Sequence, residues 1–427
     1  MIHSSLKQCL AILVMSAMVQ TGKAQSANIT IEECYESARE NYPTISKIGL
    51  IAKTRDYDLQ NASKKFLPQI TFSGQATYQS QTVSFADAVG SIPGMSLPSI
   101  SKDQYKIQGD ISQLLYDGSN TKHQKELTKA SSELQEQNLE ASLYTIKQRI
   151  NNIYFSILLM EAQLKQNELN KANLQTQIQK TEASLVNGTA FRSNLDELKA
   201  EIENLDIAST EYRSNRASYL QMLSLFIGKE LSEATHLEQP VAECFSAAIR
   251  RPELKAFDLQ KSVYDVQQKQ LNSDYLPQVN AFFQGAYGRP TLNILENKFG
   301  PWYITGLRLT WSLGGLYSLS NKKHILALNK QAVEADREAF LLNARLDLVQ
   351  QDEQVKKYME LLLRDQQVIM LRTSVARAAE AQLANGVITI HEYIQKVNAE
   401  NLARQTKILH EIQLLQAKYN QKFITGN

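Results

Sequence analysis

A heptad pattern that occurs twice is the feature that most constrains this chain. Between Ser119 and Asn187, mostly apolar side chains recur at alternating intervals of three and four residues. The first series is Ile150, Ile153, Ile157, Met160 and Leu164, then the polar Asn167 and Lys171, then Leu174, Ile178, Thr181 and Leu185. The same register recurs 198 residues later as Leu348, Gln351, Val355, Tyr358, Leu362, Arg372, Ala376, Ala379 and Leu383. A period of 3.5 residues predicts helices that pack side by side as in a coiled coil.

The uninterrupted length of each copy favours a rod or a tube over a globular domain. No Pro or Gly falls between 119 and 187, and a helix of 69 residues would be about 100 Å long. Both copies end in an Asn-Gly turn, at Gly188 and Gly386, and a second helix follows each turn. We therefore expect a duplicated helical hairpin over 119–227 and 318–423. The alternative is a single ordinary long coiled coil.

Ahead of each hairpin the hydrophobic period changes to two. Pro68 and Pro277 end helices at Leu-Pro-Gln junctions, because proline disfavours helical geometry in the preceding residue. The segments that follow alternate apolar and polar residues, which predicts two β-hairpins, over 67–116 and 277–313. We expect the strand after Pro68 to have one apolar and one fully polar face, and residues 103–116 to repeat it. The helix before the first hairpin is expected over 30–64, with Thr30 and Glu33 as its capping box.

The apolar face of these strands is expected to face lipid. Aromatic residues gather near the strand ends, as they do where a transmembrane barrel meets the two membrane interfaces. The side chains assigned to lipid are Ile70, Phe72, Tyr78, Tyr105, Ile107, Val279, Phe283, Tyr287, Leu307, Leu309 and Trp311. Four strands cannot close a barrel alone, so they would contribute to a barrel shared between subunits. The alternative is a soluble sandwich sheet.

The first residues and the charge balance indicate export and exclude a nucleic-acid partner. Residues 1–24 resemble a secretory signal peptide, with Lys7, an apolar run from Cys9 to Val19, and small residues before a cut at Gln25. An amphipathic first helix is the alternative. The remaining chain has 44 basic and 44 acidic side chains and no basic stripe.

No pattern for catalysis, a cofactor or a metal is found in the sequence. The six histidines are scattered without metal-ligand spacing, and we expect no enzymatic activity. The exported chain keeps Cys34 and Cys244, whose pairing stays open. The domain organisation is expected to be the signal peptide followed by two structural repeats, 25–243 and 244–427, with 228–243 as a linker.

These motifs together resemble the TolC-like outer membrane efflux protein family. The resemblance rests on the two Leu-Pro-Gln junctions, the Gly-marked strand-to-helix junctions at Gly118 and Gly314, the paired Asn-Gly tips, and Glu182 and Glu380 before those tips. It implies a fold that is mostly α with a β-barrel part. Three identical chains would form a twelve-stranded transmembrane barrel in the outer membrane of a Gram-negative bacterium, continued by a periplasmic α-barrel of long helical hairpins.

The resemblance also assigns functional residues to the tips. Glu392 matches an acidic position of the periplasmic gate, whereas Gln395, Asn194 and Ile388 depart from the family's gate pattern. Three acidic side chains around a narrow pore would favour cations. The expected docking residues for a periplasmic adaptor (membrane fusion) protein are Asn187, Gly188, Phe191, Asn385, Gly386, Val387 and Ile388.

The resemblance therefore implies a homotrimeric exit duct of a tripartite efflux or type I secretion system. The duct would passively conduct substrates that an adaptor and an inner-membrane RND or ABC transporter deliver, because the chain has no nucleotide-binding motif of its own. The alternative is a soluble periplasmic coiled-coil scaffold or adaptor.

Overall fold

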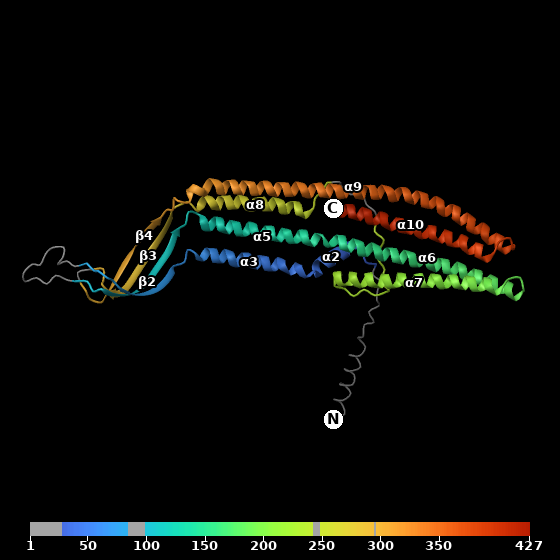
Figure 1. Cartoon of the computed structure of the whole chain (residues 1–427), viewed down its shortest axis with the longest axis horizontal. Helices are drawn as coiled ribbons and strands as arrows, with labels where there is room; N and C mark the ends of the chain where they lie inside the picture. Colours follow the sequence, from blue (N-terminus) through green and yellow to red (C-terminus); the bar gives the residue numbers. More distant parts are fainter. Residues whose placement is uncertain (1–27, 84–98, 242–247, 294–295) are drawn as a thin grey trace, which may run out of the picture. The chain divides into compact units, whose positions relative to one another are not determined.

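The structure is a computed structural model that describes residues 28–83, 99–241, 248–293 and 296–427 (Figure 1). The expected signal peptide and Cys244 lie outside these ranges. The chain forms two compact units, each built from both halves of the sequence. Unit 1 contains residues up to 45, 142–251 and 341–427, and unit 2 contains 46–141 and 252–340.

Unit 1 begins with a short capped helix, α2 (Ile31–Asn41). The predicted capping box is present, since the Thr30 hydroxyl accepts a hydrogen bond from the Glu33 amide and the Glu33 carboxylate accepts one from the Thr30 amide. The prediction of one helix over 30–64 is wrong. Pro43 forces Tyr42 into an extended conformation, so a 3₁₀ turn, η1 (Pro43–Ile45), separates α2 from α3 (Ser46–Lys64) of unit 2.

The long helices follow the predicted hairpins with one interruption. The first is divided into α5 (Asn120–Tyr144) and α6 (Ile146–Val186) at Thr145, whose hydroxyl donates to the Ser142 carbonyl oxygen. Its counterpart α9 (Leu316–Ala384) is continuous over 69 residues. The return helices are α7 (Arg192–Ile227) and α10 (Ile390–Thr425). Among the described helices, none carries an apolar stretch that could cross a membrane.

The first hairpin has a dry seam. Seam residues Ile150, Ile157 and Leu174 of α6 are fully buried, as is Leu198 of α7. Helix α2 packs against both α6 and α7 and contributes its own fully buried Cys34. The heptad pattern of the first copy therefore marks a real core.

A buried arginine fastens the linker after α7 to the first hairpin. The Arg216 guanidinium pairs with the Glu161 carboxylate at 2.7 Å. It also donates to the main-chain carbonyl oxygens of Glu233 and Thr235, at 2.9 and 2.6 Å. The linker thus satisfies the hydrogen-bonding groups of a buried cation, which would otherwise be costly to desolvate.

Unit 2 contains one four-stranded antiparallel sheet and the helices that lead into it. Its strands are β1 (Gln69–Tyr78), β2 (Asp103–Tyr116), β3 (Gln278–Arg289) and β4 (Gly300–Thr310), and they are ordered β1-β2-β3-β4. Helices α3 and α8 (Pro252–Ser273) precede β1 and β3, and α8 runs beside the start of α9 (Figure 1). Strands β1 and β3 begin directly after Pro68 and Pro277, as predicted.

Candidate functional site at the hairpin tips and the sheet

The two hairpin tips have the same backbone geometry. At the first tip the Gly188 amide donates to the Leu185 carbonyl oxygen and the Thr189 amide to that of Ser184. The Gly386 and Val387 amides make the equivalent bonds at the second tip. These paired bonds form a Schellman motif, which requires a residue with positive φ. Gly188 and Gly386 have φ of 72° and 70°. The Asn-Gly signature of the sequence therefore marks real helix ends.

The expected docking residues divide into exposed and packed ones. Phe191 and Val387 are 77% and 69% exposed at the two tips. Ile388, in contrast, packs against a buried cluster beneath the tips. Phe191 and Val387 are thus free to contact a partner, whereas Ile388 supports the tip from inside.

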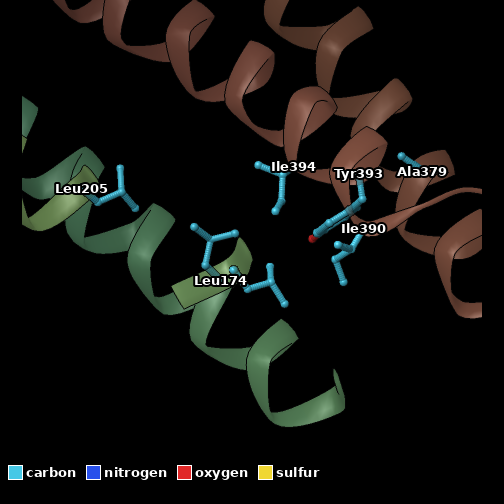
Figure 2. Close-up of a cluster of buried hydrophobic side chains, with 7 residues drawn as sticks. Leu174, Leu205, Ala379, Ile390, Tyr393 and Ile394 are labelled. Atoms are coloured by element: carbon cyan, nitrogen blue, oxygen red, sulfur yellow. The ribbon is translucent and has the colours of Figure 1, made fainter. Parts of the chain in front are cut away.

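That cluster joins the two hairpins. Its buried members come from all four helices at this end, namely Leu174, Leu198, Leu205, Ala379, Ile390, Tyr393 and Ile394. Figure 2 shows the side chains of the two hairpins turned toward one another across the gap between their ribbons. Apolar contact of this kind holds the ends of the hairpins together.

Polar side chains add ties between the hairpins around this cluster. Lys180 Nζ of α6 lies 2.8 Å from Glu380 Oε1 of α9. On the facing helices, His391 Nδ1 lies 2.5 Å from Glu197 Oε1. The Asn398 amide donates to Glu201 at 2.9 Å. Sequence reasoning singled out Glu380 but none of its partners, because nothing in a heptad pattern says which helix faces which.

Glu392 has a local structural task in this structure. Its carboxylate accepts a hydrogen bond from the Thr389 amide at 2.9 Å, and the Thr389 hydroxyl accepts one from the Glu392 amide. The backbone hydrogen bond from Thr389, with its hydroxyl contact second, holds the pKa of Glu392 below its usual value. The side chain therefore caps α10 and is ionised at neutral pH, and its assignment to a gate stays a prediction.

The sheet has the predicted two faces. The register pairs Phe72 with Gly109 and Ile107 with Tyr287, so the apolar residues of neighbouring strands lie on one side. They are exposed, and Phe72 is 80% accessible. On the other side, Asp110 accepts hydrogen bonds from the Gln108 and Gln284 amides, at 2.6 and 2.7 Å.

The second face of the sheet also carries apolar residues on β3 and β4. Phe282, Trp302 and Ile304 have the same parity as Gln284 in the β3–β4 register and lie on the polar side. Single apolar residues in an otherwise polar row leave the period of two intact, so the alternation alone did not reveal them.

Comparison with known proteins gives a match to one family model over part of the chain and a shared fold over most of it. Residues 34–229 match the family model described as outer membrane efflux protein. No match was found among curated proteins. The fold is similar to the solved structure of CusC, with a TM-score of 0.67 and 13% identity over 93% of this chain and 92% of that one.

Two further structures agree. VceC from Vibrio cholerae has a TM-score of 0.64 at 13% identity, covering 93% of this chain and 96% of its own. The open state of the MtrE outer membrane channel of Neisseria gonorrhoeae has a TM-score of 0.64 at 12% identity, covering 93% and 89%. The long helices and the four-stranded sheet are thus those of a TolC-like fold.

The matched residues 34–229 make up a little under half of the chain, and the similarity to the solved structures extends over most of its length at the level of the fold. The described residues contain no group of three or more His, Cys, Asp or Glu side chains placed to hold a metal ion.

Proposed function

We propose that three copies of this chain assemble into one exit duct, and the sheet carries this proposal. Strands β1 and β4 each pair on one side only within the described sheet, and such edges template further pairing. Joining β4 of one copy to β1 of the next would give a closed twelve-stranded barrel. The exposed apolar face, from Phe72 to Leu309, would then meet lipid, and the face with Asp110 would line water.

The second hairpin supplies a further argument for copies that pack together. Exposed apolar residues of α9 fall at multiples of seven, in the series Leu342, Val349, Leu363 and Met370. A heptad stripe on a helix surface calls for a partner helix. A neighbouring copy of the chain would cover it.

Detergent extraction and bilayer recording test the duct. The full chain, purified in a mild detergent, should have the protein mass of a trimer, and should insert into planar bilayers as uniform conducting steps. A monomer that stays soluble without detergent, as a periplasmic scaffold would, contradicts the proposal. A trimer without conductance contradicts the duct but keeps the assembly.

We place the adaptor and pump of a tripartite system at the tips, because Phe191 and Val387 are exposed apolar side chains beside tight turns. Val387→Asp should abolish co-purification of an adaptor protein and efflux of its cargo from cells. Leu402→Asp is the matched control, since Leu402 is similarly exposed on α10 but lies away from the tip. Equal behaviour of the two variants would remove the tip from the contact.

Charge and capping at Glu392 can be separated by two substitutions. Glu392→Gln removes the charge but keeps an acceptor for the Thr389 amide, whereas Thr389→Ala removes the hydroxyl partner and keeps the charge. If three Glu392 carboxylates form the gate, Glu392→Gln should weaken block by divalent cations in single-channel recordings and Thr389→Ala should not. Unchanged block in Glu392→Gln would leave Glu392 with its capping role alone.

A further inference from the structure

The polar face of the sheet carries an apolar strip that ends in an arginine. Along β4 the residues on this face are Trp302, Ile304, Gly306 and Arg308, and Phe282 of β3 lies opposite Gly306. The strip extends over seven residues of strand, which is six residue steps or about 20 Å. Figure 1 shows β3 and β4 side by side. Elsewhere this face carries mostly Gln, Thr, Ser, Asn, Lys and Asp side chains along β1, β2 and β3, with Leu114 and Ala286 as its other apolar residues.

The phenyl ring of Phe282 lies at the centre of the strip, against the neighbouring strand β4. A Cβ added at Gly306 would lie 3.3 Å from the Phe282 ring, so the ring extends over the glycine of the neighbouring strand. The Arg308 guanidinium lies 4.8 Å from the ring centroid, a cation–π geometry. Phe282 is half-buried and Arg308 is exposed, so the outer side of the guanidinium faces water.

The charge of Arg308 is not compensated on this face. The carboxylate of Asp110 is already engaged by the Gln108 and Gln284 amides. Within the described part of the chain, Arg308 forms no ion pair, and its guanidinium makes a cation–π contact with the Phe282 ring. A planar cation on an aromatic ring, continued by Ile304 and Trp302, is a surface for a solute with a ring at one end and an anionic group at the other.

We propose that the strip Phe282–Trp302–Ile304–Arg308 binds aromatic organic anions as they pass. The anionic group pairs with the Arg308 guanidinium, and the ring stacks along Phe282 and Ile304. The inference rests on the proposed function in one respect, since it assigns this face to the interior of the duct. Three copies then line one passage, and the strip favours aromatic acids over small inorganic anions among the solutes that leave.

Binding is measured on the detergent-purified full chain through the fluorescence of Trp302, with sodium benzoate as the probe. Acetate, which has the charge without the ring, and benzyl alcohol, which has the ring without the charge, are tested at equal concentrations. Benzoate should give a saturable change that acetate and benzyl alcohol do not. Trp302→Phe should abolish the signal, because the other tryptophan, Trp311, lies outside the strip.

Substitutions assign the site. Arg308→Gln and Phe282→Leu should each weaken benzoate binding about fivefold or more. Lys106→Gln is the matched control, because it removes an equal charge from the same face but away from the strip, and it should leave binding unchanged. Equal weakening by Lys106→Gln and Arg308→Gln, or a benzoate signal no stronger than that of acetate, would overturn the proposal.

Bilayer conductance separates this proposal from the duct. A conducting trimer that fails to bind benzoate contradicts the strip and leaves the duct intact. A chain that binds benzoate through Arg308 but never conducts contradicts the duct and keeps the binding site.

Discussion

The two helical hairpins share a heptad register but are held together in different ways. In the first, α6 and α7 meet along a dry seam that includes the fully buried Ile157 and Leu198. In the second, α10 packs closely against α6 and α7 of the other hairpin. Helix α9 shares small apolar clusters with α10 around Ala344 and around Ala379. Between these clusters polar side chains tie the two helices, among them Asp365 and His410, whose oxygen and nitrogen lie 2.6 Å apart.

The difference shows that a repeated period does not guarantee repeated packing. The second copy places Gln351 where the first has Ile153, and Val355 where the first has Ile157. These positions are buried in α6 and only half-buried in α9. The first hairpin is therefore a core, whereas the outer helix of the second keeps apolar surface for a neighbour. A hydrophobic core resists opening, and polar ties in contact with water contribute little each.

The largest expected effect is on the rate at which Cys34 is labelled, which reports whether the first hairpin stays closed. Burial, followed by the negative charge of Glu33, raises the pKa of this thiol to about 12. At pH 8 the thiolate fraction of Cys34 would therefore be about a thousandfold lower than that of a free cysteine. Only the thiolate form reacts with a maleimide. Labelling of Cys34 by a maleimide should be correspondingly slow in the folded protein and fast after denaturation. Rapid labelling without denaturation would mean that the seam opens readily.

The same shift has a consequence for stability. The pKa of the Cys34 thiol is higher in the folded chain than in the unfolded chain. Its contribution to the free energy of unfolding is therefore complete below about pH 8.5. It should decline as pH rises from there toward 12. A Cys34→Ala variant should lack this part of the alkaline loss of stability.

Paired truncations test the seam against its counterpart. Ile157→Ala removes a fully buried side chain and should destabilise the chain by about 3 kcal/mol, because a cavity remains. Val355→Ala, at the equivalent position of α9, should cost less than about 1 kcal/mol. Thermal unfolding followed by helical circular dichroism measures both. Equal losses would show that the hairpins are alike after all.

Two histidines on α10, His410 paired with α9 and His391 paired with α7, test whether the polar ties of this helix depend on burial. The side chains of His410 and Asp365 are 16% and 13% exposed, whereas that of His391 is 64% exposed. His410→Ala should cost about 2 kcal/mol, because it leaves the Asp365 carboxylate buried without its partner. His391→Ala should cost less than about 0.5 kcal/mol. Thermal unfolding measures the loss of stability in both variants. A larger loss in His391→Ala than in His410→Ala would contradict the expectation that burial strengthens these ties.

The starts of the return helices give the smallest expected difference. Helix α10 begins with the Thr389 capping box, whereas α7 begins at Phe191 without a side-chain cap. Thr389→Ala should lower stability by about 1 kcal/mol. Ser193→Ala, in the first turn of α7, is the control and should change little. Faster amide exchange confined to the first turn of α10 in Thr389→Ala would confirm the assignment.

Local chemistry explains why most of the fold could be predicted from the sequence. Pro68 and Pro277 each mark the end of the preceding helix, and Gly188 and Gly386 supply the positive φ of the tips. Hydrophobic periods of two and of 3.5 residues distinguish the strands from the helices. Where a local signal was passed over, the prediction failed locally. Pro43 divides the first helix, and Thr389 with Glu392 has the same capping spacing as Thr30 with Glu33.

Partners distant in the sequence could not be predicted. The pairs Lys180–Glu380 and Glu197–His391 join residues about two hundred positions apart, and a periodic pattern states which face is apolar but not which helix it meets. The apolar strip beside Arg308 was missed for a related reason. Its residues come from two strands, so it becomes a single feature only when the β3–β4 register is known.

The clamp formed by Arg216 has a consequence for how the linker can vary. The guanidinium binds main-chain oxygens of Glu233 and Thr235 and not their side chains. Exchanging either side chain therefore leaves both acceptors in place, so this segment should accept many different amino acids. Deleting Ala234, however, would move one of the two oxygens out of reach, and the spacing of the segment is what must be preserved.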